Sequence, residues 1–217
     1  MPRPSQPLIN RKVAVATALA IIDTEGLGAF SLPRLARELG VRAPSLYHHF
    51  EDRAEILEEV AQSIVLETVI PRKPSGDDWM NWFVALAMNF RRVILRHGNA
   101  APILLEFLPR DMLSPLYDDA AEFLTQAGVA TGLHVLILDG LEKLTLGAAV
   151  TEAMRRPARR GRIFGHVDPA SQPALAQAVK ANELTAADLF AETIRAFLLG
   201  VTTAPPAGGR GQDGEDG

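Results

Sequence analysis

The sequence has 217 residues, of which 47% are hydrophobic, and a formal net charge of −4 at pH 7. It contains no cysteine, which excludes disulfides, thiolate metal sites and cysteine nucleophiles, and no apolar run reaches the ~18 residues of a membrane span. The charge is uneven, because residues 1–50 carry six Lys or Arg against three Asp or Glu, whereas the remainder is acidic. A basic N-terminal part suits a nucleic-acid-binding module joined to something else, with no membrane partner.

The chain begins with residues 1–8, which contain three prolines and are predicted to form a loose arm. Asn10 can cap a helix that runs to Glu25, where Gly26 ends it. A signal peptide is the alternative, since residues 13–22 form an apolar run after a basic start. No convincing small-residue cleavage site follows, and cleavage would remove a helix that should support the next motif. We therefore expect a cytoplasmic protein.

Residues 31–50 (SLPRLARELGVRAPSLYHHF) are predicted to form two short helices around a tight turn at Gly40. Pro44 suits the first turn of the second helix, where a missing N–H costs nothing. The apolar positions that should face inward are Leu35, Ala36, Leu39, Val41 and Leu46. The outward positions of the second helix are Arg42, Ser45, Tyr47, His48 and His49. A rigid helix with this many hydrogen-bond donors fits the DNA major groove, so the stretch predicts a helix-turn-helix.

The rest of the chain shows helical periodicity without strand-like alternation, which predicts an all-α fold. Asp52 and Glu55 have capping-box spacing at the start of a helix to about Val69. Further helices are predicted over residues 79–96, 103–108, 114–128, 133–154, 172–181 and 185–199. The expected domains are a helix-turn-helix domain over residues 1–51 and a helical domain over residues 52–203. Residues 204–217 are low in complexity and are expected to be disordered.

The two long C-terminal helices are apolar over much of their circumference, as Phe190, Ile194 and Phe197 show on the last one. Such helices must be covered on every side. A second copy of the chain could cover them in a four-helix interface, which predicts a homodimer through these two helices. A monomer core remains the alternative, because periodicity does not separate the two.

The segment FSLPRLARELGVRAPSLYHHFEDRAEIL resembles the tetracycline-repressor (TetR) family of bacterial transcription regulators, most specifically at LYHHF, Arg53 and Ile56-Leu57. The segments DWMNWFVALAMNFRRVILRHG and KLTLGAAV resemble the tetracycline-repressor branch itself, so the resemblance covers about residues 10–154. It implies an all-α homodimer whose N-terminal helices bind double-stranded operator DNA and whose C-terminal helices hold a small-molecule effector. By motif position, the implied DNA-facing residues are Arg42, Ala43, Pro44, Ser45, Tyr47, His48, His49 and Arg53.

Two departures from that branch concern binding. Pro33 stands where tetracycline repressors carry a base-reading arginine, so the operator should differ from theirs. Where the branch binds magnesium-tetracycline through histidines, this chain has Leu104, Lys143 and Thr68. Leu86 stands where the branch has an asparagine that binds the drug. We therefore expect a different effector, with no metal and no cofactor.

The candidate effector-binding residues of the C-terminal part are Phe83, Leu86, Phe90, Leu104, Leu105, Leu108, His134 and Lys143, followed by Trp79, Met88 and Tyr117. Each could equally be ordinary core, because apolar pockets and apolar cores share a composition. The run RRPARRGR at residues 155–162 could be a second nucleic-acid patch, although a solvated loop is favoured.

The sequence shows no nucleophile elbow, phosphate loop or paired carboxylates, and no catalytic residues are predicted. The preferred function is a repressor that binds a pseudo-palindromic operator as a homodimer and is released by a small molecule. A DNA-binding regulator whose body binds a protein partner is the alternative, and an enzyme is the less favoured one.

Overall fold

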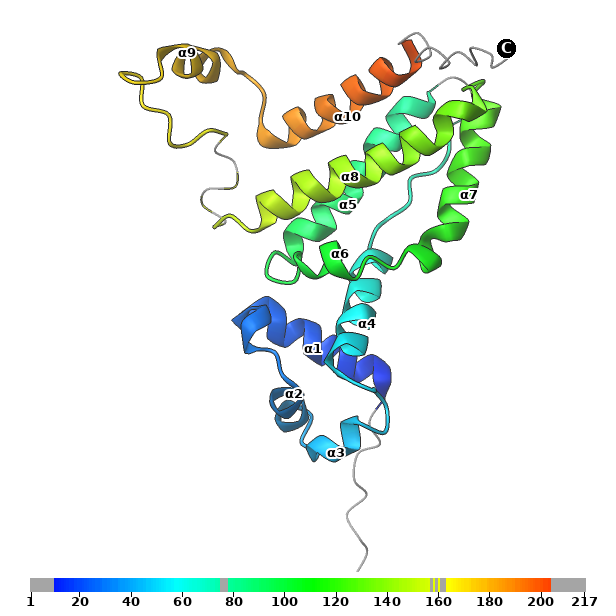
Figure 1. The fold of residues 1–217 in the computed structure, drawn as a ribbon, viewed down its shortest axis with the longest axis vertical. Coiled ribbons are helices and arrows are strands. Elements are labelled where there is room, and N and C mark those ends of the chain that lie inside the picture. The colour runs from blue at the N-terminus through cyan, green and yellow to red at the C-terminus, as the bar shows by residue number, and fades with distance from the viewer. Residues whose placement is uncertain (1–9, 75–77, 157, 159, 161–162, 204–217) are drawn as a thin grey trace, which may run out of the picture.

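A computed structural model describes residues 10–74, 78–156, 158, 160 and 163–203, and it contains helices but no strands within those ranges. The chain forms a small N-terminal head and a larger helical body, joined by one helix that runs between them (Figure 1). The predicted all-α fold is confirmed. Within the described residues, no helix is long and apolar enough to cross a membrane.

The head comprises α1 (Arg11–Glu25), α2 (Leu32–Glu38) and α3 (Ala43–Leu46), and the start of α4 (Arg53–Leu66) packs against them. Polar caps fix these boundaries, because the side chains of Asn10, Ser31 and Asp52 accept hydrogen bonds from the first turns of α1, α2 and α4. Gly40 turns the chain between α2 and α3 with φ of 67°, a left-handed conformation that glycine adopts without strain. The fully buried side chains of the head include Ile22, Leu35, Leu46, Phe50 and Ile56.

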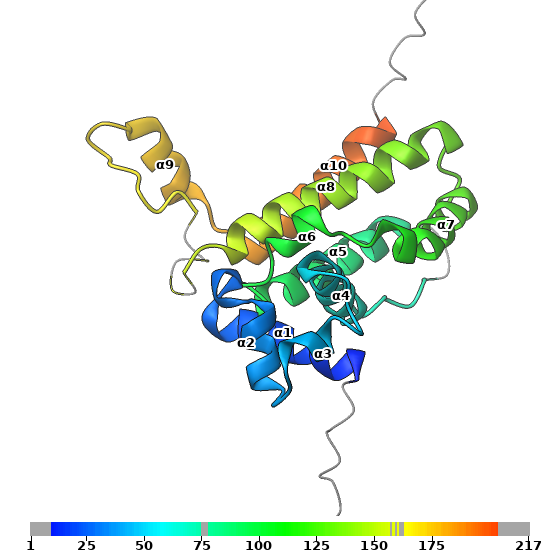
Figure 2. The same cartoon turned by 60° about the horizontal axis from the view of Figure 1, so that its bottom comes forward.

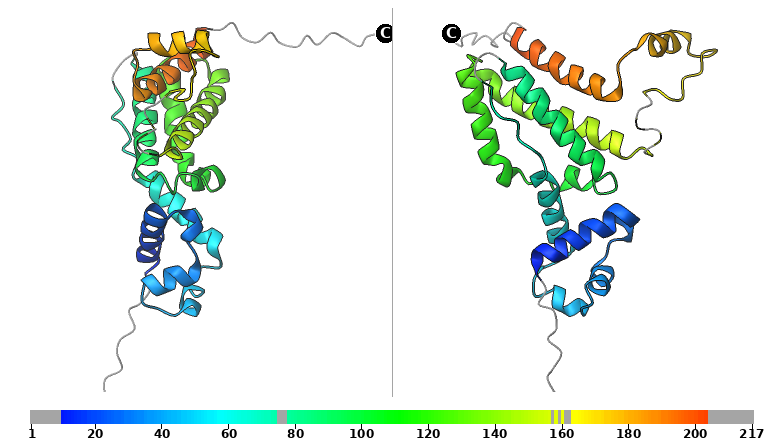
Figure 3. Two further views of the ribbon diagram at one scale, coloured as in Figure 1. Left: turned by 90° about the vertical axis from the view of Figure 1, so that its left-hand side faces the viewer. Right: turned by 180° about the vertical axis from the view of Figure 1, so that it is seen from behind.

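The body comprises α5 (Trp79–Arg96), α6 (Ile103–Glu106), α7 (Arg110–Gln126), α8 (His134–Ala153), α9 (Pro173–Ala181) and α10 (Ala186–Thr203). Helix α5 packs against both α8 and α10, and α7 lies beside α8 at the far end of the body (Figure 3). Trp82, Phe83, Ile137 and Ile194 form the core among these helices.

The core of the head continues into the body. The cluster that contains Leu35 and Phe50 of the head also contains Ile94, Leu104 and Val150, which belong to α5, α6 and α8. Helix α4 runs through this cluster and contacts α1 at one end and α5 and α6 at the other. The head is therefore packed onto the body through a continuous apolar core.

The predicted start of α7 at Ser114-Pro115 is wrong. Helix α7 begins at Arg110, directly after Pro109, and Pro115 lies inside it as the sixth residue. Pro115 has no backbone N–H to donate to the carbonyl of Asp111. Both residues are exposed, so water can donate a hydrogen bond to that carbonyl instead. The other predicted helices are found, although α4 ends three residues earlier and α10 extends to Thr203.

Two regions of the body lack a covering layer in a single chain. Helix α9 stands away from the body on an arm formed by the segments around it, and none of its residues is buried (Figures 1 and 2). Along α8 and α10, Val135 is 77% exposed, and Leu136 and Leu199 are also exposed. These are the helices predicted to form a homodimer, and the dimer remains a prediction.

Candidate DNA-reading surface and effector cavity

Helix α3 lies at the end of the head farthest from the body (Figure 1). It contains only Ala43, Pro44 and Ser45 of the predicted DNA-facing residues, because the helix ends at Leu46 and Tyr47, His48 and His49 form the turn after it. Leu46 and Phe50 are fully buried and anchor it, while Arg42, Pro44 and His48 are exposed and the Tyr47 side chain is 57% exposed. Ala43, Ser45 and His49 are partly buried between them. This face is aromatic and rich in donors, and no metal-binding cluster of His, Asp or Glu occurs in the described chain.

Arg11 of α1 fixes the end of this surface. Its guanidinium donates to the backbone carbonyl of His49, forms ion pairs with Glu55 and Glu59 of α4, and lies 4.5 Å from the centre of the Phe50 ring. The hydrogen bond from Arg11 lowers the pKa of Glu55 below its ordinary value. The last predicted residue, Arg53, is exposed at the start of α4, with its guanidinium 5.5 Å from the Phe30 ring. The reading surface is thus held rigidly on α1 and α4.

A polar junction joins the head to the body at His97, which caps the C-terminal end of α5. Its Nδ1 lies 2.7 Å from Asp23 Oδ2 of α1, and its Nε2 lies 3.1 Å from Glu67 Oε1 at the end of α4. Each ring nitrogen thus faces a carboxylate oxygen from a different helix or helix end. Asn99 adds a 2.8 Å bond to the Asp23 carbonyl. One buried imidazole therefore bridges head, connecting helix and body.

A cavity of about 430 Å³ lies between α4, α5, α7 and α8. Its lining is mostly aliphatic and aromatic, and it falls within the size range of small-molecule sites. The apolar lining residues are Val65, Leu66, Ile70, Phe83, Leu86, Ala87, Phe90, Leu108, Met112, Leu113, Pro115, Leu116, Ala120, Leu138 and Leu141. The polar ones are Thr68, Tyr117, Asp119, Glu142 and Thr145.

Tyr117 and Glu142 form a polar wall of this cavity. The Tyr117 hydroxyl donates to Glu142 Oε2, and Arg110 Nη2 lies 2.6 Å from Glu142 Oε1, so both carboxylate oxygens are engaged. Burial, and then the hydrogen bond with Glu142, raise the pKa of the Tyr117 phenol above its ordinary value. Thr68 differs, because its Oγ1 is buried without a hydrogen-bond partner. Such a group is costly unless water or a ligand satisfies it.

The structure divides the sequence-predicted effector residues into two groups. Phe83, Leu86, Phe90 and Leu108 line the cavity. Leu104 is fully buried in the core that joins head and body, and Leu105 is 61% exposed. His134 is held by a 3.0 Å contact between its Nε2 and the Val129 carbonyl, and the exposed Lys143 pairs with Asp139 at 2.6 Å. These four do not line the cavity.

Sequence reasoning missed Glu142 and Thr145 as lining residues and gave Tyr117 only as a secondary candidate. One signal was present, because Leu138, Leu141, Glu142 and Thr145 recur at helical spacing on α8. A buried carboxylate in such an apolar stripe indicates a partner or a polar cavity wall.

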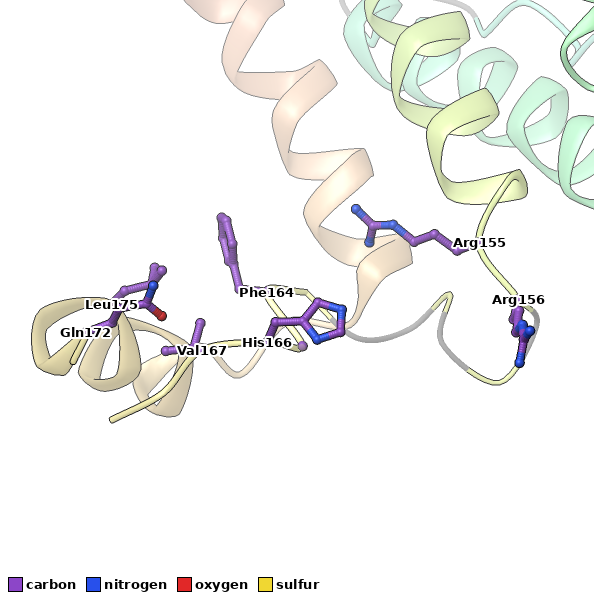
Figure 4. Close-up of a pocket in the computed structure, with 8 residues that line it drawn as sticks. Arg155, Arg156, Phe164, His166, Val167, Gln172 and Leu175 are labelled. Carbon is purple, nitrogen blue, oxygen red and sulfur yellow. The ribbon is translucent and has the colours of Figure 1, made fainter. Parts of the chain in front are cut away.

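A second hollow of about 680 Å³ lies beside the arm of α9, far from α3. Figure 4 shows Arg155 and Arg156 on the segment after α8, with Phe164, His166 and Leu175 on the arm opposite. Arg160 instead donates to the carbonyls of Leu95 and Ala153, at 3.0 Å each, and so satisfies the ends of α5 and α8. Arg159 and Arg162 of the basic run lie outside the described residues.

Comparisons with known proteins agree with this geometry. The model of the tetR family of bacterial regulatory proteins matches residues 14–60, from α1 into α4. The tetracycline repressor protein class C of Escherichia coli is 28% identical over 145 residues, which are 66% of this chain and 66% of that protein, slightly under two thirds of its length. An HTH-type transcriptional regulator of Saccharopolyspora erythraea is 27% identical over 180 residues, 82% of this chain and 72% of that one. The crystal structure of Streptomyces coelicolor ActR in complex with (S)-DNPA has a TM-score of 0.71 and 25% identity, and covers 89% of this chain and 97% of that chain.

A helix-turn-helix head on a helical body is the architecture of the DNA-binding transcriptional regulators to which this chain is similar. Residues 14–60 match the TetR family as its N-terminal helix-turn-helix, and the helical body that follows is similar to those of TetR-family proteins. The resemblance seen in the sequence is thereby confirmed. This is a family of regulators and not of enzymes.

Proposed function

We propose that this regulator is a repressor that binds its operator as a homodimer and is released by a small-molecule effector. Helix α4 carries the proposal, because it belongs to both functional regions. Ile56 and Leu57 near its start are buried in the core with α1, while Val65 and Leu66 at its end line the cavity. A ligand that displaces the cavity end of α4 therefore changes the position of the head. Residues 1–51 then serve as the DNA-binding domain and residues 52–203 as the effector-binding and dimerisation domain.

The exposed face of α3 supports specific roles on DNA. Arg42 and Ser45 would read base edges, with arginine suited to guanine, while Tyr47 and Arg53 would hold phosphates. Ala43, Pro44, His48 and His49 would lie against the same groove. Pro33 lies in the first turn of α2 and has no side-chain donor, so the operator would differ from the tetracycline operator.

The uncovered apolar residues of α8 and α10 support a homodimer through these helices. Val135, Leu136 and Leu199 would be buried against the same helices of a second copy, as in other four-helix interfaces. Two α3 helices related by a two-fold axis would enter successive major grooves, with half-sites roughly 34–36 Å apart. The operator would therefore be a pseudo-palindrome.

The cavity supports the effector role. Similar proteins bear names that describe ligand binding or repression, including ActR in complex with (S)-DNPA and the tetracycline repressor class C. Magnesium-tetracycline does not suit this cavity, because Leu86 lines it and Leu104 is buried elsewhere, and neither side chain can donate or bind a metal. The proposed effector is a different small molecule.

Binding to a DNA fragment from upstream of the protein's own gene tests the DNA-reading role. Affinity should fall steeply between low and moderate salt, because phosphate contacts release counterions. Tyr47→Ala should weaken binding about tenfold or more without changing the melting temperature, since Tyr47 is exposed on the reading face. Gln126→Ala, at the exposed end of α7, is the control and should bind normally. A salt-independent affinity would contradict the proposed contacts.

A further inference from the structure

We propose that the cavity takes an apolar ring compound that carries a hydrogen-bond donor and no negative charge. This inference rests on the proposed function, because it names the class of effector that the same cavity would hold. It follows from three properties of the lining: its charges, its free hydrogen-bonding groups and its shape.

The charged residues of the lining are both acidic. Asp119 and Glu142 line the cavity, and the described lining includes no Lys, Arg or His. The nearest cations approach from outside it, since Arg110 pairs with Glu142, and Lys73 donates to the Asp119 carbonyl at 2.9 Å. An anion that entered would lose its water beside carboxylates, with no cation in the lining to replace that water.

The free hydrogen-bonding capacity of the wall is mainly that of acceptors. Because the Tyr117 hydroxyl donates its only hydrogen to Glu142, its oxygen can only accept from a ligand. The bond to a carboxylate makes that oxygen a stronger acceptor. Thr68 Oγ1, which is buried and unpartnered, can also accept. A ligand with an N–H or O–H would find acceptors here, whereas a ligand with acceptors alone would find no donor at Tyr117 or Glu142.

The remaining lining favours flat rings. Phe83, Phe90 and Tyr117 contribute aromatic surfaces to a cavity of about 430 Å³, which suits a molecule of two or three fused or linked rings. Trp82 lies directly behind, with its ring centre 4.9 Å from that of Phe83. Because Trp82 lies next to the cavity lining, binding of a ligand in the cavity can be followed by tryptophan fluorescence.

Two dyes with the same rings test the inference in the full-length protein. N-phenylnaphthylamine is uncharged and has one N–H, and anilinonaphthalene sulfonate is the same molecule with an added sulfonate. We expect the uncharged dye to bind at least about tenfold more tightly, as shown by its enhanced emission. Energy transfer from the two tryptophans, both on α5, would place it in the cavity.

Three variants identify the groups responsible. Leu86→Trp should fill the cavity and abolish binding of the dye. If that variant does not fold, energy transfer from the two tryptophans of the unaltered protein to the bound dye still gives an independent location. Tyr117→Phe should weaken the uncharged dye about three- to tenfold by removing the acceptor, with less effect on the sulfonate. Phe164→Ser, beside the second hollow, should change neither dye.

The outcomes separate this inference from the function on which it rests. Equal or tighter binding of the sulfonate inside the cavity would overturn the proposed ligand class and leave an effector cavity in place. If neither dye binds with tryptophan energy transfer, the ligand class is again wrong. A cavity-filling variant that still responds to the cell's own effector would contradict the proposed effector cavity itself. Preferential, Tyr117-dependent binding of the uncharged dye would support both.

Discussion

The head and the body use their apolar residues in different ways. In the head, Leu35, Leu46 and Phe50 are almost fully buried in a filled core behind a short reading helix. The body borders a cavity, leaves Val135 and Leu136 exposed, and holds α9, which buries none of its own residues, on an arm. The head is complete as a single chain, whereas the body has room and surface for other molecules.

The ion pairs of the two regions differ in the same sense. Arg34 pairs with Glu25 and Glu38 on the exposed side of the head. In the body, Arg91 of α5 and Glu152 of α8 form a two-pronged pair at 2.7 and 3.0 Å, with side chains only 10% and 15% exposed. A buried pair costs desolvation to form, and it is the costlier one to break. The body thus depends on polar contacts that the head does not need.

Breaking the buried pair gives the largest expected effect. Glu152→Gln leaves the Arg91 charge buried without a counter-charge, which should lower the free energy of unfolding by about 3 kcal/mol. Denaturant titration followed by tryptophan fluorescence would measure it, since both tryptophans lie on α5, the helix that carries Arg91.

Two further variants test whether burial of the ion pair causes this loss of stability. Arg91→Met combined with Glu152→Leu removes both charges and should recover most of the lost stability. Glu38→Gln, in the exposed pair of the head, should leave the unfolding midpoint unchanged. Equal losses from Glu152→Gln and Glu38→Gln would show that the two regions do not differ in this way.

The head could be predicted closely because its signals are local. The caps Asn10, Ser31 and Asp52 and the turn glycine Gly40 each lie where the structure uses them. Each acts within three or four residues along the chain, so a single sequence contains the information. The inward positions Leu35, Ala36 and Leu46 are buried, as their spacing indicated.

The cavity could be predicted only in part because it depends on contacts between distant segments. Leu104 and Leu105 are neighbours with the same composition, yet one is fully buried and the other is exposed. Helix spacing cannot show which apolar position borders an empty space and which fills a core. The start of α7 was missed for a similar reason, since Ser114-Pro115 is a strong local signal that the preceding segment overrides.

The His97 junction tests whether head and body unfold together, with an effect of intermediate size. His97→Ala removes both bridges and leaves the carboxylates of Asp23 and Glu67 without their shared hydrogen-bond partner. Stability should fall by about 1–3 kcal/mol. The thermal transition seen by tryptophan fluorescence, which reports the body, should then separate from the circular dichroism transition, which reports all helices.

A milder variant at the same junction provides the control. Asn99→Ala removes one exposed bond to the Asp23 carbonyl and should keep the two transitions together. Coincident transitions in His97→Ala would mean that the continuous apolar core alone couples head to body.

The smallest expected effect is on the titration of Tyr117. The chain has two tyrosines, so in Tyr47→Phe the absorbance of tyrosinate reports Tyr117 alone. Its ionisation midpoint should lie above the value of about 10 for a free tyrosine, because burial first and the Glu142 hydrogen bond second raise its pKa. Since the unfolded phenol ionises first, Tyr117 stabilises the fold below about pH 10, and this contribution is lost as the pH rises beyond it. Glu142→Gln should lower the midpoint only in part, because burial remains. A midpoint equal to that of the protein in denaturant would place Tyr117 in solvent and remove the polar wall from the cavity.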